Sequence, residues 1–153
     1  MLAIGLLGAG RIGRIHGGNV AANPRARLAA VADADAKAAQ SLAEAHGAKV
    51  AAIGAIMADT SIGAVMICTP TFTHADLIEQ AAKAGKAVFC EKPVDLDAGR
   101  IETCLAVVGN AGATLMIGFN RRFDPSFADV KRRIDAGEAG DVELVTILSR
   151  DPG

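Results

Sequence analysis

Aromatic residues are scarce in this sequence. It contains no tryptophan and no tyrosine, and only 5 of its 153 residues are phenylalanine. Surfaces that bind single-stranded nucleic acid stack the bases on aromatic side chains, and a formal net charge of −1 offers no basic surface to phosphates. We therefore expect no nucleic-acid partner.

Long apolar runs are also missing, and we expect no leader. No window reaches the roughly 20 apolar residues that a membrane-spanning helix needs. Met1 leads directly into an apolar segment, with no charged region or cleavage site. The sequence predicts no membrane partner and a cytoplasmic location.

Cysteine is infrequent and irregularly spaced. Cys68, Cys90 and Cys104 form no C-x-x-C pair and leave an odd count, so neither a zinc site nor a disulfide framework is predicted. We expect three reduced core thiols and no bound metal. Apolar residues, in contrast, make up 51% of the chain, which is enough for the core of one domain of ordinary size.

The first segment organises the rest of the sequence. A short apolar run is followed at once by Gly8, Gly10 and Gly13, the pattern G-x-G-x-x-G. In a strand–turn–helix unit that binds a dinucleotide, Gly8 permits the tight turn, Gly10 leaves room for the pyrophosphate, and Gly13 lets the helix pack on the strand. Arg11 and Ile12 open that helix, whose free N–H groups point at the phosphate. Glycines also mark ordinary turns, so the motif needs its context.

A second apolar segment, 28–32, ends in Asp33, 20 residues after the last glycine of the motif. An acid at this distance binds the ribose hydroxyls of the adenosine half of a dinucleotide. The alternative is that Asp33 only caps the next helix, although Asp35 is better placed for that. A carboxylate there repels the 2′-phosphate of NADP, and Ala34 supplies no cation to offset it. With Arg11 as the one opposing cation, the sequence predicts an NAD site.

Segments of strand and helix character alternate along the first 120 residues. Strands are predicted at 28–32, 49–52, 63–68, 87–90 and 114–119, and helices at 36–46, around 55–57, at 73–84 and at 97–111. The spacing of Thr73 and Asp76 predicts a capping box, and Asp97 a second N-cap. This alternation predicts an α/β fold of the Rossmann type, with a doubly wound parallel sheet and helices on both faces.

Polar residues follow the ends of five predicted strands. They are Gly8–Gly13, Asp33, Thr69–His74, Glu91–Lys92 and Asn120–Arg122. Ligands of open α/β sheets bind outside the carboxyl ends of the strands. These segments are therefore predicted to meet at one crevice.

The pattern changes after Gly118. Residues 123–134 have the spacing of an amphipathic helix, and Val142–Ser149 alternates between apolar and polar residues. A strand of that kind belongs to an antiparallel or mixed sheet, but no partner strands follow it. We expect residues 1–120 to form a dinucleotide-binding domain and residues 121–153 to begin a second α/β domain that is cut short.

Five segments together resemble the N-terminal half of the Gfo/Idh/MocA oxidoreductase family: GAGRIGRIH, CTPTFTHADL, FCEKPVDLD, GFNRRFDPSF and SRDPG. Within the family, the last three are most similar to members that oxidise inositol. The resemblance covers all 153 residues, and E-K-P is its most specific element. It implies an NAD-dependent enzyme that takes a hydride from a polyol or sugar hydroxyl, in a homo-oligomer of full-length chains.

The resemblance assigns roles to single residues. Lys92 matches the family's active-site lysine, whose ammonium holds the substrate hydroxyl and stabilises negative charge on its oxygen; a solvated surface lysine is the alternative. His74 matches a position near the nicotinamide, with a helix-start histidine kept neutral by the dipole as the alternative. Arg121 resembles a substrate-contacting arginine, whereas Arg122 is equally suited to a structural ion pair.

Five further residues complete these expectations. Thr69, Pro70 and Glu91 are the remaining cofactor contacts that the resemblance implies. Pro93 matches a position that is often cis in the family. His16, inside the first helix, is expected to serve only in packing or capping.

The aspartate and histidine that complete catalysis in the family lie in the domain that this sequence lacks. Loss of general acid–base assistance lowers a rate by a factor of about 10²–10⁴, and most of the substrate pocket is absent as well. We expect the 153 residues alone to bind NAD without oxidising a substrate. Two alternatives stay open: a stand-alone dinucleotide-binding module with a sensing role, and a family member that acts on another sugar.

Overall fold

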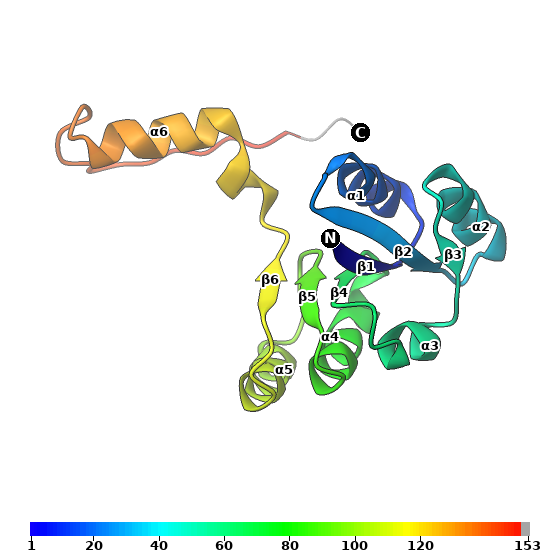
Figure 1. Ribbon diagram of the computed structural model, residues 1–153. Coiled ribbons are helices and arrows are strands. Elements are labelled where there is room, and N and C mark those ends of the chain that lie inside the picture. The colour runs from blue at the N-terminus through cyan, green and yellow to red at the C-terminus, as the bar shows by residue number, and fades with distance from the viewer. Residues whose placement is uncertain (151–153) are drawn as a thin grey trace. The chain divides into compact units, whose positions relative to one another are not determined.

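The computed structural model describes residues 1–150 of the chain (Figure 1). Residues 151–153, which end the S-R-D-P-G segment, lie outside the described residues. The chain divides into two compact units, Met1–Gly118 and Phe119–Gly153. Each unit is described by itself.

The first unit is built on a six-stranded sheet in which every neighbouring pair is parallel. Its order is β3-β2-β1-β4-β5-β6, with β1 at Leu2–Leu7, β2 at Ala26–Ala32, β3 at Lys49–Val50, β4 at Ala64–Ile67, β5 at Ala87–Cys90 and β6 at Leu115–Ile117. The chain order reverses beside β1, where β2 lies on one side and β4 on the other. The predicted doubly wound parallel sheet is confirmed.

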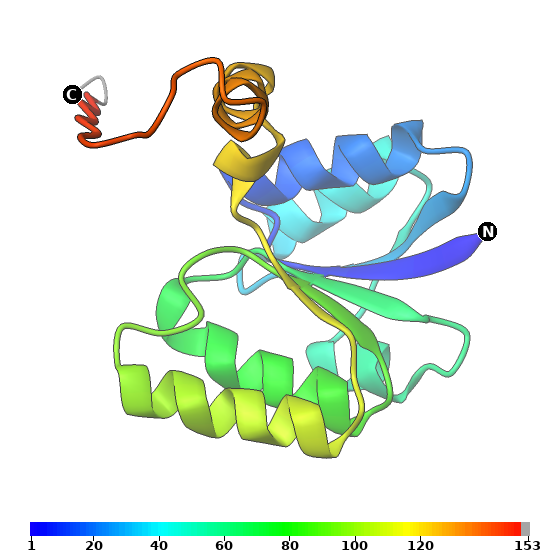
Figure 2. The same cartoon turned by 90° about the vertical axis from the view of Figure 1, so that its left-hand side faces the viewer.

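Five helices connect these strands: α1 at Arg11–Ala22, α2 at Ala36–Ala45, α3 at Ile53–Ala58, α4 at His74–Lys83 and α5 at Ala98–Asn110. Figure 2 shows α1 and α2 on one face of the sheet and α4 and α5 on the other. Because side chains alternate along a strand, Leu6 joins the core under α1 and α2, whereas Leu7 joins the core under α4 and α5. The central strand is therefore buried on both faces, as its continuous apolar run requires.

Two of the three predicted helix N-caps are present in the structure. Asp35 caps α2 by accepting from the N–H groups of Lys37 and Ala38, and Asp97 caps α5 by accepting from the N–H of Arg100. The prediction of a capping box at Thr73 is wrong, because the Thr73 side chain makes no cap hydrogen bond. A short 3₁₀ turn, η1 at Thr71–Thr73, precedes α4, so the Thr73 hydroxyl donates back to the Pro70 carbonyl at 2.7 Å.

The three cysteines are free and buried, which confirms the predicted core thiols. Burial raises the pKa of both Cys68 and Cys90 to about 12, so neither thiol is poised as a nucleophile. Among residues 1–150, no group of three metal-ligating side chains is placed to hold an ion. No helix in the same range is long and apolar enough to cross a membrane.

The second unit contains a 3₁₀ turn, η2 at Asn120–Phe123, and one helix, α6 at Pro125–Asp135. Asp124 caps α6 by accepting from the N–H groups of Ser126 and Phe127. The predicted strand at Val142–Ser149 is wrong: residues 142–150 have no regular secondary structure. A strand exists only when its backbone pairs with a neighbour, and within the described part of the chain no strand pairs with this segment.

Candidate functional site

The carboxyl ends of the central strands are aligned at one edge of the sheet. Backbone hydrogen bonds continue the ladder into the loops, from the N–H of Gly8 to Ala32, of Cys68 to Leu7, of Glu91 to Ile67 and of Gly118 to Cys90, at 2.7–2.9 Å. The loops after β1, β2, β4 and β5 therefore begin side by side. This is the edge where the sequence predicted a crevice.

The three glycines of the β1–α1 turn differ in what a side chain at each position would contact. Gly8 has a φ of 97°, and a Cβ on it would lie 2.5 Å from the carbonyl oxygen of Cys68. A Cβ on Gly13 would collide with the carbonyl oxygen of Gly8. Gly10 differs, since a Cβ on it would meet no atom within 4 Å apart from its chain neighbours. Packing explains Gly8 and Gly13, whereas Gly10 faces open space that a ligand can fill.

The first turn of α1 offers N–H groups beside Gly10. Gly10 is the N-cap residue and makes no side-chain cap, and the first turn carries no acidic residue. The helical hydrogen-bond ladder begins only with the N–H of Arg14, which donates to Gly10 at 3.0 Å. The N-terminal N–H groups and the positive end of the helix dipole thus remain available, so the turn fits a pyrophosphate.

Asp33 holds the glycine turn against the end of β2. One carboxylate oxygen accepts from the N–H of Ala9 at 2.5 Å, and the other accepts from the N–H of Asp35 at 2.7 Å. Asp35, not Asp33, supplies the cap of α2. Asp33 is therefore free of the capping role that was its alternative explanation, and its carboxylate lies in the loop expected to bind a ribose.

A pocket of about 580 Å³ opens between these loops. Its lining comes from the turn after β1, the end of β2, α3, and the segment after β4: Gly8, Gly10, Ala32, Asp33, Ala34, Ile53, Cys68, Thr69, Pro70, Phe72, Thr73 and Leu77. Apolar side chains such as Ile53, Phe72 and Leu77 line it together with the polar residues Asp33, Thr69 and Thr73, a mixture typical of small-molecule sites. The predicted residues Gly8, Gly10, Asp33, Thr69 and Pro70 are brought together here.

His74 lies at the start of α4 but is only 1% exposed. Its Nδ1 lies 2.7 Å from the carbonyl oxygen of Pro93, and its Nε2 lies 2.8 Å from that of Thr69. Both partners are acceptors, and a neutral imidazole donates from only one nitrogen. In this structure the ring joins the loop after β4 to the loop after β5, and its predicted contact with the nicotinamide stays a prediction.

Glu91, Lys92 and Pro93 follow β5. The Lys92 side chain is exposed, and among residues 1–150 its ammonium makes no hydrogen bond or ion pair. The Lys92–Pro93 peptide is cis. Glu91 is held by His16 of α1, whose Nε2 lies 2.8 Å from the Glu91 Oε1. Neither residue lines the pocket described above. The structure thus leaves the lysine without a partner among residues 1–150 and fixes the glutamate beside it, and their predicted roles stay predictions.

From the sequence, His16 was expected to serve only in packing or capping. The sequence did contain a sign that His16 has a hydrogen-bond partner, because His16 shares the buried helical face of Gly13, Gly17 and Val20. A polar ring on a buried face needs a hydrogen-bond partner. The identity of that partner, 75 residues away in the sequence, came only with the fold.

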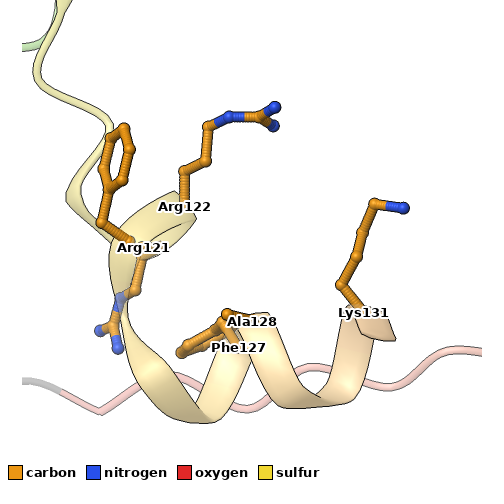
Figure 3. Close-up of a pocket in the computed structure, with 6 residues that line it drawn as sticks. Arg121, Arg122, Phe127, Ala128 and Lys131 are labelled. Atoms are coloured by element: carbon orange, nitrogen blue, oxygen red, sulfur yellow. The ribbon is translucent and has the colours of Figure 1, made fainter. Parts of the chain in front are cut away.

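The predicted substrate residue Arg121 belongs to the second unit. Figure 3 shows the pocket that it lines with Arg122, Phe123, Phe127, Ala128 and Lys131, and which has a volume of about 490 Å³. The Arg121 guanidinium lies 5.0 Å from the centre of the Phe127 ring, whereas Arg122 and Lys131 extend to the other side. Within the described residues Arg122 forms no ion pair, and the substrate role of Arg121 stays a prediction.

A family model described as an oxidoreductase family with an NAD-binding Rossmann fold matches residues 2–119. An inositol 2-dehydrogenase of Rhizobium meliloti (strain 1021) is 61% identical over 97% of the chain and 45% of its own length. The chain thus spans about half the length of the curated relatives that it matches.

Two solved structures extend this likeness. A myo-inositol dehydrogenase of Corynebacterium glutamicum superposes with a TM-score of 0.85 at 44% identity, covering 92% of this chain and 43% of that one. A scyllo-inositol dehydrogenase of Lactobacillus casei, with bound NAD(H) and scyllo-inositol, superposes with a TM-score of 0.86 at 33% identity and the same coverage. The first unit therefore has the architecture of the NAD-binding part of such enzymes.

Proposed function

The chain belongs to the Gfo/Idh/MocA oxidoreductase family, whose N-terminal part is an NAD-binding Rossmann domain, and from this membership we propose that it is the cofactor half of an NAD-dependent polyol dehydrogenase. The substrate that we propose is an inositol. The support for this choice is that relatives named as inositol 2-dehydrogenases match nearly the whole chain. A family member that acts on another sugar is the alternative.

The proposed cofactor pose follows from the sheet order. In a doubly wound sheet a dinucleotide crosses the crevice at the point where the strand order reverses, which here lies between β1 and β4. The ribose of the adenosine half then binds Asp33, and the adenine enters the apolar part of the pocket near Ile53. The pyrophosphate lies over Gly10, and the nicotinamide half extends toward the ends of β4 and β5.

Lys92 carries the proposed chemistry. When NAD is bound, its nicotinamide ring accepts the hydride from the carbon that bears the reacting hydroxyl. The hydroxyl proton must leave at the same time, and negative charge grows on the oxygen. An exposed ammonium without another partner in residues 1–150 can hold that oxygen and stabilise the charge. The placement of Lys92 at the end of β5 is the single observation that carries this proposal.

The proposal extends to a second, substrate-binding domain. We place the start of a substrate domain after residue 120, because the family match ends at residue 119 and the first compact unit ends at Gly118. Most of the substrate pocket and the general base would come from that domain. We further propose a cytoplasmic location, which the three free cysteines favour. The homo-oligomer that the family resemblance implies for the full-length protein stays part of the proposal.

The test is NADH formation by the full-length protein with myo-inositol, scyllo-inositol and glucose in turn. We expect activity with at least one inositol. Lys92→Ala should lower kcat by about 10²–10³ and leave the affinity for NAD nearly unchanged, because the lysine acts mainly in the transition state.

Lys83→Ala is the matched control, since Lys83 is an exposed lysine at the C-terminal end of α4 and does not line the pocket. It should have wild-type kcat. NAD binding without oxidation of any polyol would instead support the sensing module.

A further inference from the structure

His16 and Glu91 form a polar pair between α1 and the loop after β5. The His16 Nε2 donates to the Glu91 Oε1 at 2.8 Å, and the two side chains are only 17% and 16% exposed. The imidazole also packs edge-on against the Phe89 ring, with 4.9 Å between ring centres and 65° between the ring planes. The histidine is thus fixed by a ring contact and a charge-assisted hydrogen bond at once.

Gly118 gives independent support that this pair is a defined feature. A Cβ on Gly118 would lie 3.0 Å from the Cζ of Phe89 and 3.1 Å from the Oε1 of Glu91. Both distances are tighter than ordinary contacts, so either group would have to move. The residue after β6 is therefore small where the Phe89 ring and the Glu91 carboxylate need the space.

The pair connects two parts of the proposed site. His16 lies on α1, the helix whose N-terminus faces the proposed pyrophosphate position. Glu91 precedes Lys92 directly, and Lys92 has no side-chain anchor of its own among residues 1–150. The position of the lysine is therefore set by the backbone at 91–93. The Glu91 side chain fixes this backbone to α1, beside the Glu91 N–H bond to Ile67 and the His74 contact with the Pro93 carbonyl.

We propose that His16 is a positioning residue: through its hydrogen bond to Glu91 it holds the Glu91–Lys92 turn in the place that the nicotinamide half and the substrate hydroxyl require. This rests on the proposed function of Lys92. A purely structural role would affect folding stability or the whole cofactor equally. A positioning role affects the nicotinamide half and turnover, and spares the adenosine half, which the proposed pose places at the end of β2.

The experiment compares His16→Ala and His16→Gln in the full-length protein. For each variant we measure kcat with the inositol that the wild type oxidises best, the calorimetric affinities for NAD and ADP-ribose, and the melting temperature. ADP-ribose contains the adenosine and pyrophosphate parts but no nicotinamide. His46→Ala is the control, since His46 ends α2 at its C-cap.

We expect His16→Ala to lower kcat by about tenfold or more, as loss of a hydrogen bond to a charged group allows. The ratio of NAD affinity to ADP-ribose affinity should fall, whereas ADP-ribose affinity itself should stay within twofold. His16→Gln keeps an N–H donor at a similar reach and should restore most of kcat. His46→Ala should match the wild type in kcat and in both affinities.

Wild-type kcat in His16→Ala, or equal losses of NAD and ADP-ribose affinity, would overturn the proposal. If His16→Ala does not fold, Gly118→Ala tests the same point, because its Cβ would crowd the Glu91 Oε1 that accepts from His16 and should lower kcat likewise. If the wild type oxidises no polyol, the proposed function fails. The ratio of NAD to ADP-ribose affinity then still decides whether His16 positions the nicotinamide side.

Discussion

At the scale of single residues, Gly10 separates what packing requires from what a ligand requires. A side chain at Gly10 would meet no protein atom outside its chain neighbours, whereas side chains at Gly8 or Gly13 would meet backbone. Gly10→Val should therefore fold normally and lose NAD affinity by at least about 100-fold, because it blocks the pyrophosphate from the helix N–H groups. Calorimetric titration with NAD and circular dichroism measure the two effects.

Gly18→Ala is the matched control, since Gly18 also has open space around it but lies inside α1. It should bind NAD as the wild type does, with a small gain in helix stability. Normal NAD affinity in Gly10→Val would mean that the turn serves the fold alone.

Asp33 sets the choice between NAD and NADP in this account. Asp33→Asn keeps an acceptor oxygen for the N–H of Ala9 or Asp35 and removes the charge that repels a 2′-phosphate. The preference for NAD over NADP should shrink by about tenfold, which corresponds to one like-charge contact near a surface. Competition titrations with both cofactors measure the ratio.

Asp35→Asn is the control for this change, because Asp35 caps α2 and lines no part of the pocket. The ratio of NAD to NADP affinity should be unchanged in Asp35→Asn. A wild-type protein that binds NADP more tightly than NAD would contradict the role of Asp33 and point to Arg11 as the residue that accommodates the 2′-phosphate.

Residues with a fixed spacing could be predicted, and residues with a distant partner could not. The glycine motif and Asp33 follow each other at an interval set by one strand–helix–strand unit, so the sequence alone places them at one end of the sheet. His16 needs Glu91, 75 positions away, and His74 needs the Pro93 carbonyl, 19 positions away. Such partners depend on which strands become neighbours, and no local pattern records that.

At the scale of elements, the start of β5 depends on a buried lysine. Lys86 is 4% exposed, and its Nζ donates to the carbonyl oxygens of Asp59 and Ile62 at 2.8 and 2.9 Å. It thereby connects the turn before β4 to the turn before β5. Lys86→Met would leave both carbonyls without this donor and should lower the free energy of unfolding by about 2–4 kcal/mol.

Urea unfolding measures that loss, with Lys83→Met on the surface of α4 as the control. The control should change stability by less than about 0.5 kcal/mol. Equal shifts in the two variants would mean that the Lys86 hydrogen bonds contribute nothing net to the fold.

Most elements could be predicted because their signals are local. Asp35 and Asp97 cap helices as expected, and β5 has the predicted bounds Ala87–Cys90. The prediction of a capping box at Thr73 was wrong because a 3₁₀ turn, which has no strong sequence signature, precedes α4. The prediction of a strand at Val142–Ser149 was wrong for another reason. Alternating apolar and polar residues allow a segment to pair as a strand, but they supply no partner strand.

At the scale of the whole molecule, the segment after Asp141 carries apolar side chains without cover. Leu144 and Ile147 are 84% and 78% exposed, and Leu148 is similar. Exposed apolar residues with unpaired backbone promote association. We expect the 153-residue chain to self-associate and a chain that ends at Gly140 to remain monomeric in light scattering. Identical monomers from both chains would contradict this expectation.

The central claim is that one dinucleotide crosses the carboxyl edge of the sheet from Asp33 to Lys92, over Gly10. A crystal structure of the protein with bound NAD measures this most directly. The account predicts the ribose of the adenosine half on the Asp33 carboxylate, the pyrophosphate within hydrogen-bond distance of the first N–H groups of α1, and the nicotinamide on the β5 side of the crevice near Lys92. NAD bound elsewhere, or with its nicotinamide directed away from Lys92, would contradict it.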